Sequence, residues 1–210
     1  VLYQPTPLSS FHLSYGTSFN TSGDAYQYDA GTANVAPEAS RNLELGGKFD
    51  AESGDLSARI ALFHSTKTNE RNRDADSVNA CNYVLSGKRH AAGMEFNLAG
   101  RVTPHWEVYL SYAWIPIAKV DSSSGAVGTE PVGSRPGLTP RHTASLWTTY
   151  QATSRLRVGA GVTARSEDRP VGLAQTATVT APAFATVDLM AEYRWQPITL
   201  KANLTNVGNR

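Results

Sequence analysis

The stretch WEVYLSYAW, residues Trp106 to Trp114, alternates between large apolar side chains and polar or small ones. Side chains of a β-strand point to opposite faces with a period of two, so this pattern predicts a strand with one apolar face and one polar face. Its length is close to the roughly ten residues with which a tilted strand crosses a bilayer. The stretch therefore predicts either a membrane-spanning strand or a half-buried strand of an antiparallel sheet.

The same alternation recurs along most of the chain. The segments that carry it, with a short stub at residues 1–4, are 11–19, 42–50, 56–65, 89–98, 142–150, 156–165, 187–195 and 198–207. No segment shows the 3.6-residue period of an amphipathic helix. We therefore predict an all-β chain of about ten strands.

The connections between these segments alternate in length. Short links at 5–8, 51–55, 100–105, 151–154 and 196–197 alternate with long polar ones at 20–41, 68–87, 115–140 and 166–185. Long loops on one side and short turns on the other are typical of an outer-membrane β-barrel with up-and-down strands. A soluble β-sandwich also alternates in hydropathy, but its Greek-key connections explain the two loop classes less well.

Composition excludes several other classes. The 210 residues include 19 Lys and Arg against 18 Asp and Glu, for a net charge of +1. This balance does not indicate a nucleic-acid partner, because such proteins carry a strongly basic face. The single cysteine, Cys81, cannot form an internal disulfide, and no Cys and His cluster has zinc-site spacing. No apolar run approaches the roughly 20 residues of a spanning helix.

Enzyme motifs are weak or absent. Residues Gly159 to Ala164 fit the glycine pattern of dinucleotide-binding loops, but a polar loop follows them where that fold needs a helix. Neither G-x-S-x-G nor H-E-x-x-H occurs. His142 and Ser145 could be imagined as a base and a nucleophile, yet their spacing in an alternating strand places them on opposite faces. We expect no enzymatic activity and no cofactor.

The stretch APEASRNLELGGKF, Ala36 to Phe49, resembles a motif of TonB-dependent outer-membrane siderophore receptors. Further stretches resemble motifs of that family in the family's order: ALF with KTN at 61–69, GMEF with GR and Trp106 at 93–106, TPRH with LWTTY at 139–150, and NLTNV at 203–207. The resemblance covers essentially the whole chain. It implies that the chain would contribute about ten strands to the 22-stranded barrel of this family.

The resemblance also carries expectations about domains and function. Receptors of this family have a signal peptide, a TonB box, a plug domain and a final strand, and none of these is recognisable here, so we expect a C-terminal portion of the barrel. The implied function is binding of ferric siderophores and their TonB-powered import across a Gram-negative outer membrane. The partners would be the siderophore, TonB through the missing N-terminal region, and membrane lipid. A passive porin-like barrel, or less plausibly an outer-membrane enzyme, remains an alternative.

Ferric siderophores are commonly anionic, so guanidinium groups and aromatic rings suit a wall that binds them. Candidates on the long loops or at their edges are Tyr26, Tyr28, Arg71, Arg73, Arg135, Arg165 and Arg169. The polar face of the strands carries Arg89, Arg157, Arg165 and Arg194, which we expect to face the barrel lumen. No metal site is predicted, because iron would arrive chelated by the siderophore.

Overall fold

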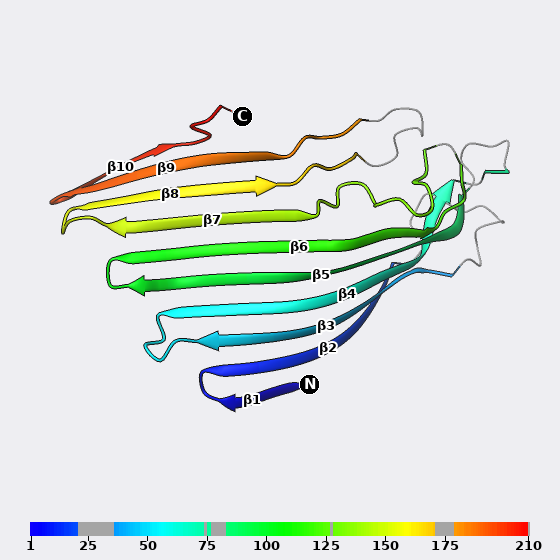
Figure 1. Ribbon diagram of the computed structural model, residues 1–210, viewed down its shortest axis with the longest axis horizontal. Coiled ribbons are helices and arrows are strands. Elements are labelled where there is room, and N and C mark those ends of the chain that lie inside the picture. The colour runs from blue at the N-terminus through cyan, green and yellow to red at the C-terminus, as the bar shows by residue number, and fades with distance from the viewer. Residues whose placement is uncertain (21–35, 74, 77–82, 127, 171–178, 210) are drawn as a thin grey trace.

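The computed structural model describes residues 1–20, 36–73, 75–76, 83–126, 128–170 and 179–209. Within them the chain forms one ten-stranded antiparallel sheet in which the strands follow one another in chain order (Figure 1). The strands are β1 (Leu2–Thr6), β2 (Ser9–Asn20), β3 (Glu38–Asp50), β4 (Leu56–Arg73), β5 (Tyr83–Thr103), β6 (Trp106–Ser122), β7 (His142–Gln151), β8 (Leu156–Arg165), β9 (Phe184–Trp195) and β10 (Ile198–Leu204). The predicted fold class is confirmed.

The connections separate by length as expected. Short turns join the strands at one end of the sheet, and the long connections gather at the other (Figure 1). β1 and β10 form the two edges of the sheet, so the N- and C-termini lie on opposite edges. No helix in the described part of the chain is long and apolar enough to cross a membrane.

Two of the predicted long loops are partly wrong, because strands run into them. β4 continues to Arg73, β5 starts at Tyr83, and β6 continues to Ser122. The β4 extension, residues 68–73, is entirely polar, whereas the β5 and β6 extensions mix apolar and polar residues. In the β4 extension Glu70 pairs across the strands, at 2.7 Å from Arg89 of β5. Backbone pairing does not depend on side-chain hydropathy, so the ladder continues after the apolar alternation has ended.

The strand register assigns each residue to one of two faces, since directly paired residues share a face. One row runs Leu13, Leu45, Leu62 and Met94 across β2 to β5, and we call this side the outer face. The neighbouring row runs His12, Gly46, Ala61 and Glu95, and we call this side the inner face. The predicted apolar and polar faces thus extend unbroken across adjacent strands.

The outer face has no protein layer packed against it. Leu45 is 54% exposed, Leu62 is 52% exposed and Tyr15 is 66% exposed, whereas the buried apolar side chains of the described residues are Val108, Val120, Ala126 and Met190. A sandwich would bury such strand faces between two sheets. The strands here contact their sheet neighbours in a single layer. The soluble-sandwich alternative is therefore wrong.

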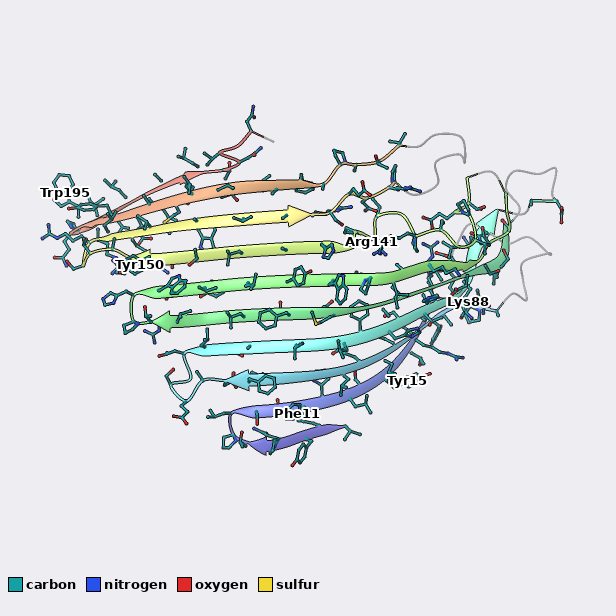
Figure 2. The ribbon with its side chains drawn as sticks, viewed as in Figure 1. Phe11, Tyr15, Lys88, Arg141, Tyr150 and Trp195 are labelled. Carbon is teal, nitrogen blue, oxygen red and sulfur yellow. The ribbon has the colours of Figure 1, made fainter. Side chains whose placement is uncertain are left out.

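Aromatic residues lie at both ends of the strands on the outer face. Trp195 and Tyr150 lie at the end with the short turns, and Tyr15 lies toward the end with the long connections (Figure 2). Trp106, paired with Tyr150 across β6 and β7, donates its indole N–H to the Thr148 hydroxyl at 2.6 Å. Aromatic girdles at the two bilayer interfaces have this arrangement in outer-membrane barrels.

On the inner face, rings pack over glycines of the neighbouring strand. Trp147 of β7 pairs with Gly161 of β8, where an added Cβ would lie 2.5 Å from the indole ring. Phe63 and Gly93 form a similar pair between β4 and β5, with the corresponding distance at 2.9 Å. These glycines leave room for large inward side chains, which explains the small residues on the polar face of β8.

Candidate ligand-binding site

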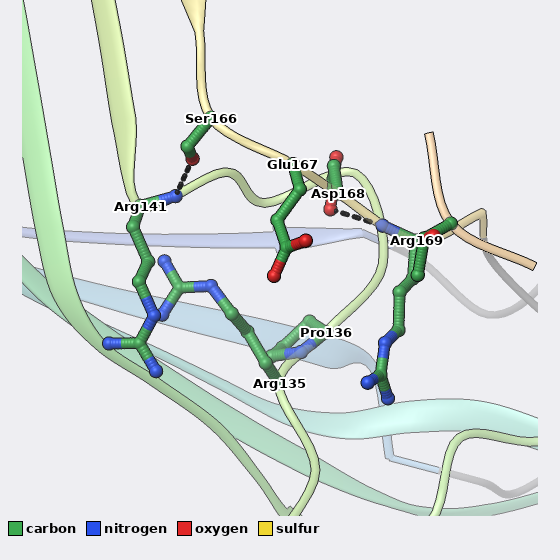
Figure 3. A pocket seen from close by; sticks show the side chains of 8 residues that line it. Arg135, Pro136, Arg141, Ser166, Glu167, Asp168 and Arg169 are labelled. Atoms are coloured by element: carbon green, nitrogen blue, oxygen red, sulfur yellow. Dashed lines mark hydrogen bonds between the residues drawn. The ribbon is translucent and has the colours of Figure 1, made fainter. Parts of the chain in front are cut away.

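A cavity of about 310 Å³ lies between the long β6–β7 and β8–β9 connections. Its walls are formed by Arg135, Pro136, Arg141, Ser166, Glu167, Asp168, Arg169 and Thr180 (Figure 3). It therefore joins segments that are far apart in sequence, at the end of the sheet that carries the long connections.

Arg135 is held by backbone carbonyls of its own connection and of β6. Its Nε donates to the Thr139 carbonyl at 2.6 Å, and one terminal nitrogen donates to the Ile115 and Pro140 carbonyls at 2.6 and 3.2 Å. These bonds leave the other terminal nitrogen without a described partner. The guanidinium is thus fixed in place, with donors still available to a ligand.

Asp168 joins the two connections to each other. One carboxylate oxygen accepts from the backbone N–H groups of Thr139 and Arg169, at 3.2 and 2.7 Å, and the other accepts from Arg165. Asp168 is only 7% exposed, and its backbone also pairs with Ala181. These hydrogen bonds satisfy the buried carboxylate of Asp168, and they hold the groups that donate to it in place. The junction around Asp168 therefore positions the cavity wall.

The cavity carries more positive than negative charge. Burial lowers the pKa of Arg135, the nearby Arg141 lowers that pKa further, and Asp168 opposes both effects. The side chains of Arg135 and Arg141 lie next to each other on one side of the cavity, and that of Arg169 lies on the other side (Figure 3). The Glu167 side chain lies between these two sides. Arginine remains protonated in proteins, so these neighbouring cations repel one another. A bound anion would relieve that repulsion.

The predicted ligand-binding residues fall into three groups. Arg135 and Arg169 line the cavity, and the guanidinium of Arg165 is engaged by Asp168 behind its wall. Arg71 lies away from the cavity lining, on the β4 extension, where its backbone N–H donates to Glu38 at 2.9 Å. Tyr26, Tyr28, Cys81 and the side chain of Arg73 lie outside the described residues.

Our prediction omitted three charged residues that line the cavity: Arg141, Glu167 and Asp168. Arg141 lies in the TPRH motif at 139–142, and the two acids lie in the RSEDR stretch at 165–169. Charged residues cluster in both stretches, which was the available signal. The sequence did not show that the two stretches meet, because they lie on different loops.

The predicted lumen-facing arginines lie on the inner face and form ion pairs there. Arg89 contacts Glu130 at 2.9 Å in addition to Glu70, Arg157 donates to Glu107, and Arg194 lies 3.7 Å from Glu192. The Arg89 to Glu130 pair links β5 to the β6–β7 connection. These arginines stabilise the sheet through their ion pairs. Their guanidinium groups therefore have fewer free hydrogen-bond donors for a ligand than those of the cavity arginines.

His142 and Ser145 are not arranged as a catalytic base and nucleophile. His142 pairs with Trp114 on the outer face, whereas Ser145 pairs with Ser111 on the inner face, as the spacing predicted. The His142 Nδ1 lies 2.8 Å from the Tyr112 hydroxyl. Among the residues that the structure describes, no three His, Cys, Asp or Glu side chains are grouped to hold a metal ion.

Comparison with known proteins covers nearly the whole chain. Residues 1–207 match the family described as TonB dependent receptor-like, beta-barrel. The probable TonB-dependent receptor BfrD of Bordetella pertussis is 31% identical over 99% of this chain and 28% of its own length. The probable TonB-dependent siderophore receptor PiuA of Acinetobacter baumannii is 27% identical over 100% of this chain and 29% of its own length.

Solved structures share the fold. The crystal structure of PiuA superposes with a TM-score of 0.85 at 24% identity, covering 100% of this chain and 31% of that one. The closed form of the ferric-catecholate import receptor Fiu of Escherichia coli superposes with a TM-score of 0.82 at 24% identity, covering 100% and 30%. The chain spans less than a third of the length of these relatives.

Proposed function

The chain belongs to the TonB dependent receptor-like β-barrel family, and from that premise we propose that it forms part of a receptor that binds ferric siderophores and imports them with energy supplied by TonB. Proteins of this family lie in the Gram-negative outer membrane, so the apolar outer face is the wall that contacts lipid. The long connections then lie on the extracellular side, where a siderophore arrives.

The observation that carries the proposal is the cavity lined by Arg135, Arg141 and Arg169 at the extracellular end. Guanidinium groups form planar, charge-assisted hydrogen bonds with oxygen anions, which siderophores present around their iron. Iron is cargo in this proposal, chelated by the siderophore, and the protein supplies no metal ligand and no cofactor. Tyr26, Tyr28, Arg71 and Arg73 remain predicted contributors from neighbouring loops, while Arg165 holds Asp168 in the cavity wall.

The chain's own residues have distinct tasks in this binding step. Arg135 offers its remaining guanidinium donors from a fixed position, while Arg169, exposed and without a described side-chain partner, can move toward the chelate. The Glu167 carboxylate lines the same cavity and would repel a bound anion. We infer no chemical transformation at this site. The family consists of receptors and transporters, which favours this function over the enzyme alternative.

The proposal predicts that Arg141→Gln combined with Arg169→Gln weakens ferric siderophore binding by the full-length protein by roughly tenfold for each arginine removed, because each change deletes a charged hydrogen-bond donor. The measurement is equilibrium binding of radioactive iron chelates of catecholate, hydroxamate and carboxylate chemistry. The control is Arg155→Gln with Lys201→Gln, which changes the net charge equally at the opposite end of the sheet.

Equal binding by the cavity variant and the control variant would contradict the assignment of the cavity. Uptake assays separate the receptor from the passive porin-like alternative. Uptake of the bound chelate should stop in cells that lack TonB, whereas uptake through an open pore would continue at the same rate.

A further inference from the structure

The outer face carries its positive charge in one place. The register places Arg41 of β3, Thr66 of β4, His90 of β5 and Lys119 of β6 in one row on that face. Lys88 lies on the same face of β5, two residues beyond His90, at the end of the sheet that carries the long connections (Figure 2). Among register-paired strand residues with described side chains, the other lysines and arginines lie on the inner face.

This basic patch, defined as Arg41, Lys88 and Lys119, begins where the apolar band ends. On β6 the outward residues run from Trp106 to Ile117 before Lys119 follows on the same face. At about 3.3 Å per residue this run is about 35 Å long, and a strand tilt of about 40° reduces its height to about 27 Å. Outer-membrane barrels have an apolar band of about 25 Å. The patch therefore lies at the level of the outer-leaflet headgroups.

The cations of the patch have no carboxylate partner among the described residues. Asp121 lies beside the row, but His90 engages it, with Nδ1 at 2.9 and 2.7 Å from its two oxygens. His90 in turn stacks on His64, with the ring centroids 5.9 Å apart. On the inner face, by contrast, cations at the same level are paired: Lys67 lies 3.5 Å from Glu38, and Arg89 contacts Glu70.

We propose that Arg41, Lys88 and Lys119 bind the phosphate groups of an anionic lipid in the outer leaflet. Long basic side chains lay their alkyl stems along apolar surface and extend their charge to the headgroup level, where phosphates are located. Charge-assisted hydrogen bonds from guanidinium and ammonium groups suit phosphate oxygens. The patch is continuous with the lipid-facing wall, so its occupant is a membrane lipid. The inference concerns the outside of the barrel and is independent of what the cavity binds.

The test is native mass spectrometry of the full-length protein in detergent, titrated with a diphosphorylated lipid A and with the same lipid after removal of its phosphates. Each basic residue near a charged headgroup contributes about fivefold to affinity. We therefore expect Lys88→Gln with Lys119→Gln to lower binding of the phosphorylated lipid about 30-fold. The matched control is Arg59→Gln with Lys201→Gln, which removes equal charge from the inner face.

A second measurement uses the unaltered protein and does not depend on the folding of a variant. The phosphorylated lipid should protect Lys88 and Lys119 from an amine-reactive acetylating reagent, while Lys48 and Lys201 on the inner face react as before. Equal binding of the dephosphorylated lipid, an equal loss in the control variant, or the absence of selective protection would each overturn the proposal. Protection by inorganic phosphate alone would also overturn it, since the site would then not require a membrane lipid.

Discussion

Replacing Gly100 by alanine is expected to destabilise the folded protein by about 3 kcal/mol or more. We expect this to be the largest effect of any glycine-to-alanine substitution in the sheet. Gly100 has a φ of +132°, a conformation that L residues rarely adopt. An added Cβ would lie 1.9 Å from the backbone carbonyl oxygen of Asp55. Strain at such a φ costs 1–3 kcal/mol, and forced overpacking adds about the same.

The Asp55 carbonyl cannot easily move away. It accepts the Arg101 N–H at 2.7 Å, and the Arg101 guanidinium contacts the Asp55 carboxylate at 2.5 Å. The tight turn between β3 and β4 is thus bonded to β5 through both the backbone and the side chain of Arg101, the residue after Gly100. Relief of the clash would require breaking these bonds.

Gly16→Ala is the matched control, because an added Cβ on β2 meets nothing within 4 Å. The measurement is the denaturant midpoint of the full-length protein reconstituted in lipid vesicles, followed by tryptophan fluorescence. We expect a lower midpoint for Gly100→Ala and a nearly unchanged one for Gly16→Ala. If both variants unfold at the same denaturant concentration, the close packing of the turn against β5 is not as described.

Asp168→Asn is expected to loosen the junction between the β6–β7 and β8–β9 connections. The substitution keeps the size of a side chain that is only 7% exposed but removes the charge that Arg165 contacts. Loss of a charged hydrogen bond costs about 2 kcal/mol, which corresponds to about 30-fold faster local opening. Hydrogen exchange at the Thr139 and Arg169 amides, which donate to Asp168, measures that opening.

Glu167→Gln serves as the control for Asp168→Asn, because it removes the same charge from the adjacent exposed position. We expect its exchange rates at Thr139 and Arg169 to match those of the unaltered protein. Siderophore binding should fall in Asp168→Asn and should hold or rise in Glu167→Gln, since the second substitution removes a negative charge from the cavity lining. Equal exchange rates in the two variants would show that Asp168 does not hold the junction.

Much of the fold could be predicted because its signal is local. The alternation of Trp106 to Trp114, and its recurrence, depends on one strand at a time, and the two classes of connection indicate the order of the sheet. The strand ends were harder to predict. Residues 68–73 are polar, yet they belong to β4 because the backbone ladder continues there and ion pairs such as Glu70 with Arg89 replace apolar contacts.

The site was predicted only in part. Arg135 and Arg169 stood out as arginines on long loops, and the structure brings both to one cavity. Nothing local indicated that Asp168, on the β8–β9 connection, would accept the Thr139 N–H of the β6–β7 connection, or that Arg141 and Arg169 would line one cavity. These relations arise between two connections that β7 and β8 separate. Only the register of β7 and β8 determines how the two connections meet.

The sequence alone determined the period-two pattern, the all-β class and the division into an apolar and a polar face, because these follow from how successive side chains leave an extended backbone. The tertiary structure decided which charges are neutralised. Arg89 and Arg157 are paired across strands, whereas no ion pair joins Arg169 or the outward Lys119 to a carboxylate among the described residues. Charge pairing depends on distances across the sheet and between loops, and neighbours in the chain carry no information about those distances.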